Sequence, residues 1–375
     1  MSLYERASII PGRSCTRSKS PDRLIKAWAS HARGAEIVDT EDNRYIDMLC
    51  ALGAVSLGYG TDNEYMPGVM SLPHIYEIEA GEAVLRQVAP WASSVRFFKT
   101  GSESTSAAVM VAKAATGRSR VVAGDWAYHG WHEWTGQIER FKYGFQALVE
   151  REDCAAVIVE PPRWPAPRPE LDGQVGDFLA LMKEICARTG TLLIVDEMIY
   201  GGRWALGGAC EYYGIVPDMA TFGKAIANGQ SVACVVGGQA LAEHGELASG
   251  TFSGDATGLG ALLDTLDIYR REPVIDTLWE RGRQLQAGLR RVVPPELAAV
   301  EGQPVHQRIR FLSETSAATY DYRTNGRPLA QAFREGMAER GVIMLPDAIN
   351  VMYAHTPDQI DRVIEAVGET CRAIA

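Results

Sequence analysis

The chain has 375 residues, of which 46% are hydrophobic, 22% charged and 8% aromatic, and this composition excludes disordered, collagen-like and coiled-coil proteins. At roughly 100–200 residues per domain, the length predicts two or three structural units. There are 47 Asp and Glu against 37 Lys and Arg, which gives a formal charge of −10. Because so acidic a surface repels phosphate backbones and anionic lipids, we expect no nucleic-acid and no membrane partner.

The cysteines and the N-terminal segment indicate in which cellular compartment the protein is located. The seven cysteines are scattered and never occur as C-x-x-C, which favours reduced thiols. The N-terminal segment has charges at Glu5 and Arg6 and no long apolar core, so we expect neither a signal peptide nor a membrane-spanning helix. Both features predict a cytoplasmic protein.

In chain order, the first predicted element is a hairpin over residues 35–49, where AEIVDTEDNRYIDML alternates around a central turn. The middle of the chain alternates short apolar runs with helical patterns, which is typical of a mainly parallel sheet covered by helices. The predicted strands are 118–123, 155–160, 192–196, 219–222 and 233–237, and the predicted helices are 103–115, 175–189, 260–271, 274–293 and 357–374. We expect a large α/β domain over residues 56–258 and a smaller domain built from residues 1–55 and 259–375.

Asp196 is the most informative single residue, because it ends the apolar run TLLIVD. An ionised carboxylate at the end of a buried strand costs on the order of several kcal/mol unless a cation or a protonated ring nitrogen compensates it. Ligands of open α/β sheets bind at the carboxyl ends of the strands, which makes Asp196 a candidate binding residue. The alternatives are that it caps the following helix or pairs with Arg203.

Lys224 follows the strand-like run MATFG and precedes AIANG, so it also lies where a strand ends. A lysine in a partly desolvated pocket loses proton affinity and forms a Schiff base with an aldehyde. Pyridoxal phosphate requires such a lysine together with an aspartate that keeps its pyridine nitrogen protonated. Taken alone, Lys224 is a solvated loop lysine; its pairing with Asp196 favours the cofactor.

Two hydroxyl-rich turns are candidates for holding a phosphate. TGSES (residues 100–104) places a glycine and a hydroxyl at the start of a predicted helix, where backbone N–H groups are available to an anion. The alternative is a plain helix N-cap. SGTFSGD (residues 249–255) offers a further hydroxyl or forms a hairpin corner.

The segment AYHGWHEW (residues 127–134) gathers two histidines and several aromatic side chains. His129 and His132 are three positions apart, but no further ligand lies nearby to complete a metal site. An aromatic ring stacked on a flat cofactor explains the segment better, with Tyr128 as the candidate. Trp131 and Trp134 are better explained as a core or dimer-interface patch.

Five segments carry a resemblance to a known family: VRFFKTGSESTSAAVMVAKAATGR, YHGWHEW, AAVIVEPP, LLIVDEMIYGGRWALGGACEYYGIVPDMATFGKAIANG and GTFSG. In this order and spacing the chain resembles the class III pyridoxal-phosphate-dependent aminotransferases, in particular the subgroup related to glutamate-1-semialdehyde aminomutase. The resemblance runs from about Pro11 to the C-terminal helix. It implies pyridoxal phosphate as cofactor and the fold type I of these transferases, with a mainly parallel seven-stranded sheet in the large domain and a small α/β domain built from both termini.

The resemblance assigns the catalytic roles to three residues. Lys224 resembles the lysine that forms the internal aldimine and then shuttles the proton between the substrate and the cofactor. Asp196 matches the partner of the pyridine nitrogen, and Tyr128 matches the stacking aromatic.

The other cofactor-binding residues that the resemblance implies are Gly101 and Ser102 for the phosphate, His129 beside the stacking aromatic, Glu160 near the cofactor hydroxyl, Met198 under the ring where the family usually has valine, and Thr251. Thr251 resembles the threonine that reaches the phosphate of the neighbouring subunit. The resemblance therefore implies a homodimer with shared active sites.

The chain departs from the aminomutase pattern at the positions expected to contact substrate. Lys19, in the segment TRSKSP that also contains Arg17, stands where aminomutases place a carboxylate-binding arginine. Leu52 replaces a tryptophan of that pocket, and Asn350 falls where a glutamate is common. These departures argue against aminomutation of glutamate semialdehyde itself and leave Arg17, Lys19, Leu52 and Asn350 as the candidate substrate residues.

The leading functional hypothesis is a transaminase that moves an amino group from an amine or amino-acid donor to a carbonyl acceptor by a ping-pong mechanism through the Lys224 Schiff base. The first alternative is an isomerase that moves an amino group within one molecule. The second is a degenerate family member that binds the cofactor or a partner without catalysis, which the intact set of Lys224, Asp196 and Tyr128 disfavours.

Overall fold

The structure, a computed structural model, describes Ser2, Tyr4 and residues 24–27, 29–53, 55–59, 75–142, 151–161, 175–312 and 328–375. The candidate substrate residues Arg17 and Lys19 lie outside the described residues, as does the side chain of Leu52. The chain divides into two compact units: unit 1 contains residues 1–61, 276–317 and 321–375, and unit 2 contains residues 62–275 and 318–320.

Unit 2 is built on a seven-stranded sheet with the strand order β4-β10-β9-β8-β7-β5-β6. The neighbours from β9 to β6 pair in parallel, and β10 pairs antiparallel with both β9 and β4, so β10 is the one strand of this sheet that runs in the opposite direction. The predicted mainly parallel sheet is confirmed. The strands are β4 (Ser94–Phe98), β5 (Arg120–Gly124), β6 (Glu139–Phe141), β7 (Cys154–Val159), β8 (Leu192–Asp196), β9 (Met219–Gly223) and β10 (Ala233–Gly237).

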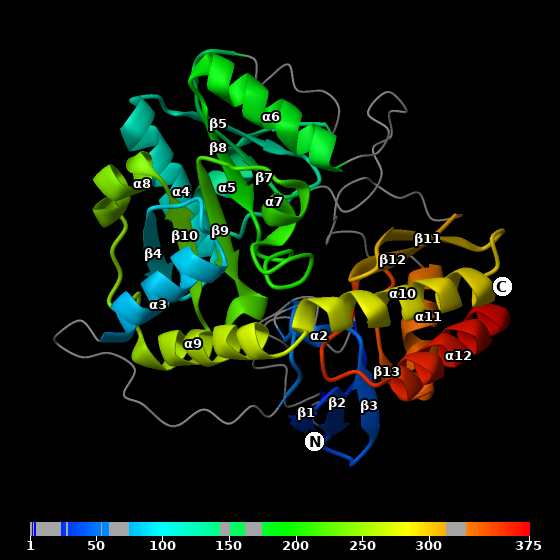
Figure 1. The fold of residues 1–375 in the computed structure, drawn as a ribbon. Helices are drawn as coiled ribbons and strands as arrows, with labels where there is room; N and C mark the ends of the chain where they lie inside the picture. The colour runs from blue at the N-terminus through cyan, green and yellow to red at the C-terminus, as the bar shows by residue number, and fades with distance from the viewer. Residues whose placement is uncertain are drawn as a thin grey trace. The chain divides into compact units, whose positions relative to one another are not determined.

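Helices cover both faces of this sheet (Figure 1). On one face, α4 packs its alanines and valines on the strands; on the other, α3 and α9 pack on Phe97, Phe222 and Val236. The apolar runs of β7 to β10 are buried along their length because both faces are covered. The helices are α3 (Ile75–Gln87), α4 (Gly101–Thr116), α5 (Glu133–Gln137), α6 (Val175–Thr189), α7 (Gly208–Tyr213), α8 (Gln239–His244) and α9 (Ala256–Arg271), with 3₁₀ helices η6 (Lys224–Ala227) and η7 (Gly245–Leu247).

The parallel arrangement brings the carboxyl ends of five strands to one edge of the sheet. Strands β4, β5, β7, β8 and β9 run in the same direction. The residues that follow these strands in sequence therefore meet at this edge, which is where open α/β sheets bind ligands. Lys99, Tyr128, Glu160, Asp196 and Lys224 all lie at or just beyond these strand ends.

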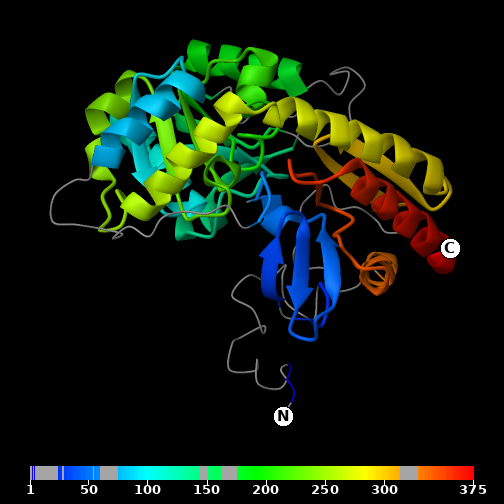
Figure 2. The same ribbon diagram turned by 60° about the horizontal axis from the view of Figure 1, so that its bottom comes forward.

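Unit 1 contains two smaller sheets. One has the order β1-β2-β3-β13 and the other β11-β12-β14, and Figure 2 shows β1 to β3 side by side. The predicted hairpin of residues 35–49 is the antiparallel pair β2 and β3. The elements are β1 (Ala29–Arg33), β2 (Glu36–Asp39), β3 (Arg44–Asp47), α2 (Cys50–Gly53), α10 (Val274–Val292, which begins at the end of unit 2), β11 (Ala298–Gln303), β12 (His306–Phe311), α11 (Pro328–Glu339), β13 (Val342–Ile343), β14 (Ile349–Asn350) and α12 (Pro357–Ile374).

Helix α9 differs from its predicted place. The sequence pattern begins it at Gly260 and groups it with the C-terminal domain, whereas the structure begins it at Ala256 and places it in unit 2. The reason is local, since Asp255 caps the helix through Gly258 N, and Leu259, Leu262 and Leu266 join the core beneath the sheet. The boundary between the units consequently falls at Asp276.

No helix in the described part of the chain is long and apolar enough to cross a membrane. The six cysteines in the described residues are all buried and none is in a disulfide.

Glu197 is a fully buried carboxylate that fixes the segment after β8. Its two oxygens accept from Ala209 N (2.9 Å) and Cys210 N (2.7 Å) at the start of α7. Gly208 has φ +77°, and a Cβ there would lie 2.2 Å from Glu197 Oε2, so only glycine allows this approach. Burial raises the pKa of Glu197 to about 7, although both backbone donors lower it.

We predict that Glu197 makes the stability of the protein fall as the pH rises. The pKa is 4.5 for an ordinary glutamate and about 7 in the folded chain, so the unfolded state releases the proton first. The cost begins near pH 4.5, grows through pH 7 and reaches up to about 3 kcal/mol. Chemical unfolding of wild type and Glu197→Gln at a series of pH values measures it, because glutamine keeps a carbonyl acceptor and does not ionise. Parallel pH profiles of the two proteins would contradict the prediction.

Candidate functional site

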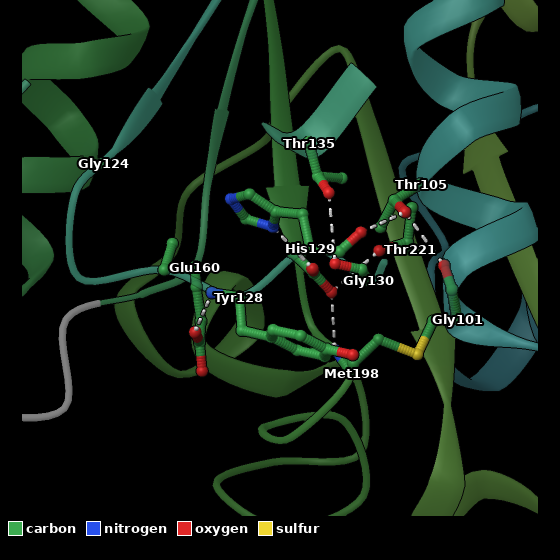
Figure 3. Close-up of polar contacts among 12 residues, drawn as sticks. Gly101, Thr105, Gly124, Tyr128, His129, Gly130, Thr135, Glu160, Met198 and Thr221 are labelled. Carbon is green, nitrogen blue, oxygen red and sulfur yellow. Dashed lines mark hydrogen bonds and ion pairs between the residues drawn. The ribbon is translucent and has the colours of Figure 1, made fainter. Parts of the chain in front are cut away.

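The carboxylate of Asp196 makes polar contacts with His129, Met198 and Thr221, three residues that Figure 3 labels at this edge of the sheet. Asp196 is only 2% exposed. Its Oδ2 lies 2.8 Å from His129 Nδ1, while Oδ1 accepts from Thr221 Oγ1 (3.0 Å) and from Met198 N (3.2 Å). These donors come from the segment after β5, from β9 and from the turn after β8, so the buried charge is compensated from three elements.

The contact with Asp196 fixes the proton on His129. A carboxylate accepts and does not donate, so Nδ1 of His129 carries the hydrogen. The ring is buried, and its Nε2 has no hydrogen-bond partner among the described residues. The backbone is also fixed, since Thr105 Oγ1 in α4 donates to His129 O at 2.8 Å. His129 is therefore held as a donor that faces Asp196.

The start of α4 forms a cup that is suited to a phosphate. Thr100 is the N-cap and forms a capping box with Glu103, so the N-cap alternative and the phosphate hypothesis describe the same turn. The N–H groups of Gly101 and Ser102 belong to the first turn, which has no intrahelical acceptors for them. A Cβ at Gly130 would lie 2.3 Å from Ser102 Oγ, which shows how closely the backbone after His129 covers this turn. We call the N–H groups of Gly101 and Ser102 and the Ser102 hydroxyl the phosphate cup.

Met198 lies against two glycines of the site. A Cβ at Gly101 would lie 3.0 Å from Met198 Sδ, and a Cβ at Gly223 would lie 2.8 Å from the same atom. The two glycines thus leave room for the thioether between the phosphate cup and the end of β9. Met198 is 8% exposed, so its side chain is buried beside these two glycines.

Lys224 begins the 3₁₀ helix η6 directly after β9. Its φ is +50°, a left-handed conformation that lysine rarely adopts. Such conformations persist where the surrounding structure enforces them, and they concentrate at functional sites. The neighbouring residues of η6, Ala225 to Ala227, are fully buried, so the backbone of Lys224 is anchored.

Tyr128 and Glu160 lie at the ends of the segments after β5 and β7. Tyr128 N donates to Glu160 Oε2 at 3.3 Å, and the Tyr128 ring is 47% exposed. Partial burial raises the pKa of the Tyr128 phenol, so the ring is neutral at physiological pH. Glu160 is 4% exposed and also accepts from Tyr200 Oη at 3.4 Å. An exposed neutral ring beside an oriented carboxylate is an arrangement that can cover a flat ligand.

Thr251 lies exposed on the turn that precedes α9. The turn is closed by two backbone hydrogen bonds, from Ser253 N to Gly250 O and from Asp255 N to Phe252 O. We call residues 250–255 the Thr251 turn. Its role toward a neighbouring subunit stays a prediction.

Asn350, predicted as a substrate residue, is 2% exposed and belongs to the interior of unit 1. Its Oδ1 lies 2.6 Å from His306 Nδ1, its N donates to Met48 O, and its O accepts from Cys50 Sγ at 3.5 Å. In these contacts Asn350 connects β12 and β14 to the start of α2, the helix that contains Leu52.

The aromatic residues after His129 differ in burial: Trp134 packs on the core, whereas Trp131 is exposed. His132 Nδ1 lies 2.7 Å from Ser106 Oγ, which also accepts from Trp134 Nε1, and Trp134 packs on the core next to α4. Trp131 is 77% exposed. Within the described residues there is no group of three His, Cys, Asp or Glu side chains that would hold a metal ion.

Sequence reasoning missed Thr221 and Tyr200. Thr221 is a hydroxyl within the otherwise apolar strand MATFG, and this polar residue in a buried strand is the signal that identifies it as a partner for the neighbouring strand end. Tyr200 donates to Pro161 O at 2.6 Å, next to Glu160. No sequence signal marks that contact.

Comparisons with known proteins agree with this geometry. The family model for class III aminotransferases matches residues 18–135 and 133–362. A 3-aminobutyryl-CoA aminotransferase of Cloacimonas acidaminovorans is 28% identical over 99% of this chain and 96% of that protein. A glutamate-1-semialdehyde 2,1-aminomutase of Natronomonas pharaonis is 30% identical over 98% of each chain. The FumI protein of Sphingopyxis sp. MTA144, solved in its PLP internal aldimine form, has a TM-score of 0.86 and 26% identity over 99% of this chain and 95% of that chain.

The residues at the sheet edge fit pyridoxal phosphate. The phosphate cup supplies N–H donors at a helix N-terminus, and glycine at positions 101 and 130 is what lets the surrounding atoms approach it. The buried Asp196, with its hydrogen-bond donors, could be the partner of a protonated pyridine nitrogen, and Lys224 has the primary amine that an aldehyde requires.

We predict that His129→Leu weakens the binding of pyridoxal phosphate about 10- to 100-fold, the value of one hydrogen bond to a charged group. Without the Nδ1–H donor, Asp196 Oδ2 loses its hydrogen-bond partner, and the carboxylate that would face the pyridine nitrogen is no longer held in place. Titration of the cofactor-free protein measures the affinity. His132→Leu is the matched control, because His132 contacts Ser106 and not Asp196. Equal affinities of the two variants would contradict the assigned role.

Proposed function

Because this chain belongs to the class III aminotransferase family, we propose that the residues at its sheet edge transfer an amino group from an amine or amino-acid donor to a carbonyl acceptor, with pyridoxal phosphate as cofactor. The observation that carries the proposal is the buried Asp196 with its donors, one strand away from the strained Lys224. The chain is a transaminase-type enzyme that acts on small molecules.

Pyridoxal phosphate supplies an electron-accepting ring that stabilises negative charge on the carbon next to the amino group. The chain supplies the rest. Asp196 would be the partner of the pyridine nitrogen, and its two carboxylate oxygens are held in place by the His129 and Thr221 donors. The phosphate cup would hold the phosphate, and Tyr128 and Met198 would pack against the ring.

Lys224 carries the proton. Its amine would hold the aldehyde of the cofactor and, once a substrate amine has taken that place, would accept a proton from the substrate carbon and give one back. Glu160, oriented by Tyr128 N and Tyr200, is placed for the hydroxyl side of the cofactor. The donor leaves as a carbonyl product before the acceptor binds, which is a ping-pong reaction.

We predict that Lys224→Ala abolishes turnover and the visible absorption band of the lysine-bound cofactor. The measurement is the spectrum of the purified holoenzyme, followed by addition of single amines without an acceptor. In the wild type, a donor amine removes the band and leaves the pyridoxamine form, which also ranks the donors. Normal turnover by Lys224→Ala would exclude the proposed role.

The relative of Natronomonas pharaonis supports a second candidate, an intramolecular aminomutase. This reaction uses the same lysine and aspartate and differs only in the retention of the substrate within the site. Turnover of a single substrate without an external acceptor, after the enzyme is primed in the pyridoxamine form, would favour the isomerase over the transaminase. The residues predicted to decide between them are Arg17, Lys19, Leu52 and Asn350.

The assembly that we propose is a homodimer in which each Thr251 reaches the phosphate of the neighbouring subunit. Large apolar side chains are exposed around the Thr251 turn: Ile75 (54%), Ile78 (60%) and Phe252 (59%). Helix α3 and the turn are neighbours, since a Cβ at Gly254 would lie 2.2 Å from Glu77 Oε1. An apolar patch of this kind on a folded unit supports burial against a second copy.

We predict that Ile78→Glu shifts the protein toward the monomer, because a carboxylate at the centre of an apolar interface is left without water or a partner. Sedimentation velocity over a range of protein concentrations measures the distribution. Val216→Glu is the control, since Val216 is similarly exposed (51%) and lies in the loop after α7. A wild type that sediments as a monomer, or an Ile78→Glu variant that stays dimeric, would contradict this interface.

A cytoplasmic location is the last part of the proposal. The six cysteines in the part of the chain that the structure describes are buried and form no disulfide, which supports a reducing compartment.

A further inference from the structure

Lys99 joins three segments that surround the proposed cofactor site. Its N–H donates to Glu103 Oε2 (3.0 Å) in the first turn of α4, and its carbonyl accepts from Ser231 Oγ (2.8 Å) in the loop after η6. Its Nζ lies 2.6 Å from Asp255 Oδ2. Lys99 therefore connects the first turn of α4 to the loop after η6 and to the start of α9.

Asp255 is the other end of this connection. Its Oδ2 also accepts from Gly258 N (2.8 Å), which caps α9, and its own N–H closes the Thr251 turn onto Phe252 O (3.2 Å). The side chains of Lys99 and Asp255 are only 27% and 11% exposed. An ion pair that is largely shielded from water, with a charge-assisted hydrogen bond, resists displacement more than a surface pair does.

We propose that Lys99 and Asp255 are positioning residues for the cofactor phosphate: their ion pair fixes the Thr251 turn relative to the phosphate cup, so that Thr251 stands where the phosphate of the neighbouring subunit is bound. The inference rests on the proposed dimer with shared sites. Neither residue contacts the cofactor, and the effect of Lys99 on cofactor binding is transmitted through Thr251.

Two other roles would be consistent with the same ion pair. Lys99 could act on the phosphate directly through its charge, or the pair could only stabilise the fold. A double-mutant cycle with Thr251 separates them, because only a residue that works through Thr251 loses its effect when the threonine hydroxyl is absent.

The experiment measures the dissociation constant of pyridoxal phosphate for cofactor-free full-length dimer, together with the melting temperature of each variant. Lys99→Met, Asp255→Asn and Thr251→Ala each raise the dissociation constant of pyridoxal phosphate about tenfold. This is the effect expected for the loss of one charge-assisted contact, or of the Thr251 hydroxyl that the ion pair positions. The double variant Lys99→Met/Thr251→Ala binds as weakly as Thr251→Ala alone. Lys99→Arg restores most of the affinity.

Asp267→Asn is the matched control, because Asp267 pairs with Arg270 and Arg271 on the exposed side of the same helix; it leaves the affinity unchanged. Asp255→Asn keeps an oxygen for Gly258 N, so this variant retains the cap of α9 and carries the test if Lys99→Met does not fold. Additive losses in the double variant would assign Lys99 a direct contact with the phosphate. Unchanged affinity in Lys99→Met and Asp255→Asn, or in Thr251→Ala, would also overturn the inference.

The failure of this inference is distinguishable from failure of the proposed function. A wild type that shows the visible cofactor band and is converted by donor amines, but whose affinity does not respond to Lys99, retains the transaminase function and loses only the positioning role. A wild type without the band loses the function itself.

Discussion

The buried charge of Asp196 is the constraint on which the site depends. A carboxylate that is 2% exposed is stable only if hydrogen-bond donors replace the water it has lost. His129, Thr221 and Met198 N provide them from three separate segments, so the sheet must be assembled before the charge is compensated. The same donors hold the carboxylate that we propose as the partner of a protonated ring nitrogen. The buried charge that the fold must compensate is thus the one that the proposed chemistry uses.

The sheet was predictable because its signal is local. The ranges 192–196 and 175–189 match β8 and α6 to the residue, since a strand buried on both faces is a continuous apolar run and a covering helix is amphipathic along its length. Strand β6 has three residues, and β13 and β14 have two each. Such strands exist only through pairing with distant segments, which no local pattern encodes.

The candidate site could be predicted from the sequence where a single residue type indicates the chemistry. It could not be predicted where the site depends on a contact between distant residues. Lys224 and Asp196 stand out by their type and place in the sequence, and the family resemblance suggested the remaining candidate cofactor residues. The bond between His129 and Asp196 spans 67 positions, so the sequence indicated the histidine but not its partner. Asn350 shows the opposite case: the resemblance suggested a substrate contact, whereas the structure adds bonds to His306 and Cys50 that depend on the fold of unit 1.

An acidic protein that binds an anionic cofactor must overcome its own charge locally. The formal charge of −10 is spread over the whole chain, and at physiological ionic strength charges further than about 8 Å from the phosphate are largely screened. The N–H groups of the phosphate cup, at the positive end of α4, act within hydrogen-bond distance and are not screened in this way. We therefore propose that the first turn of α4 determines whether a small anionic group binds, and that the net charge of the chain has little effect on it.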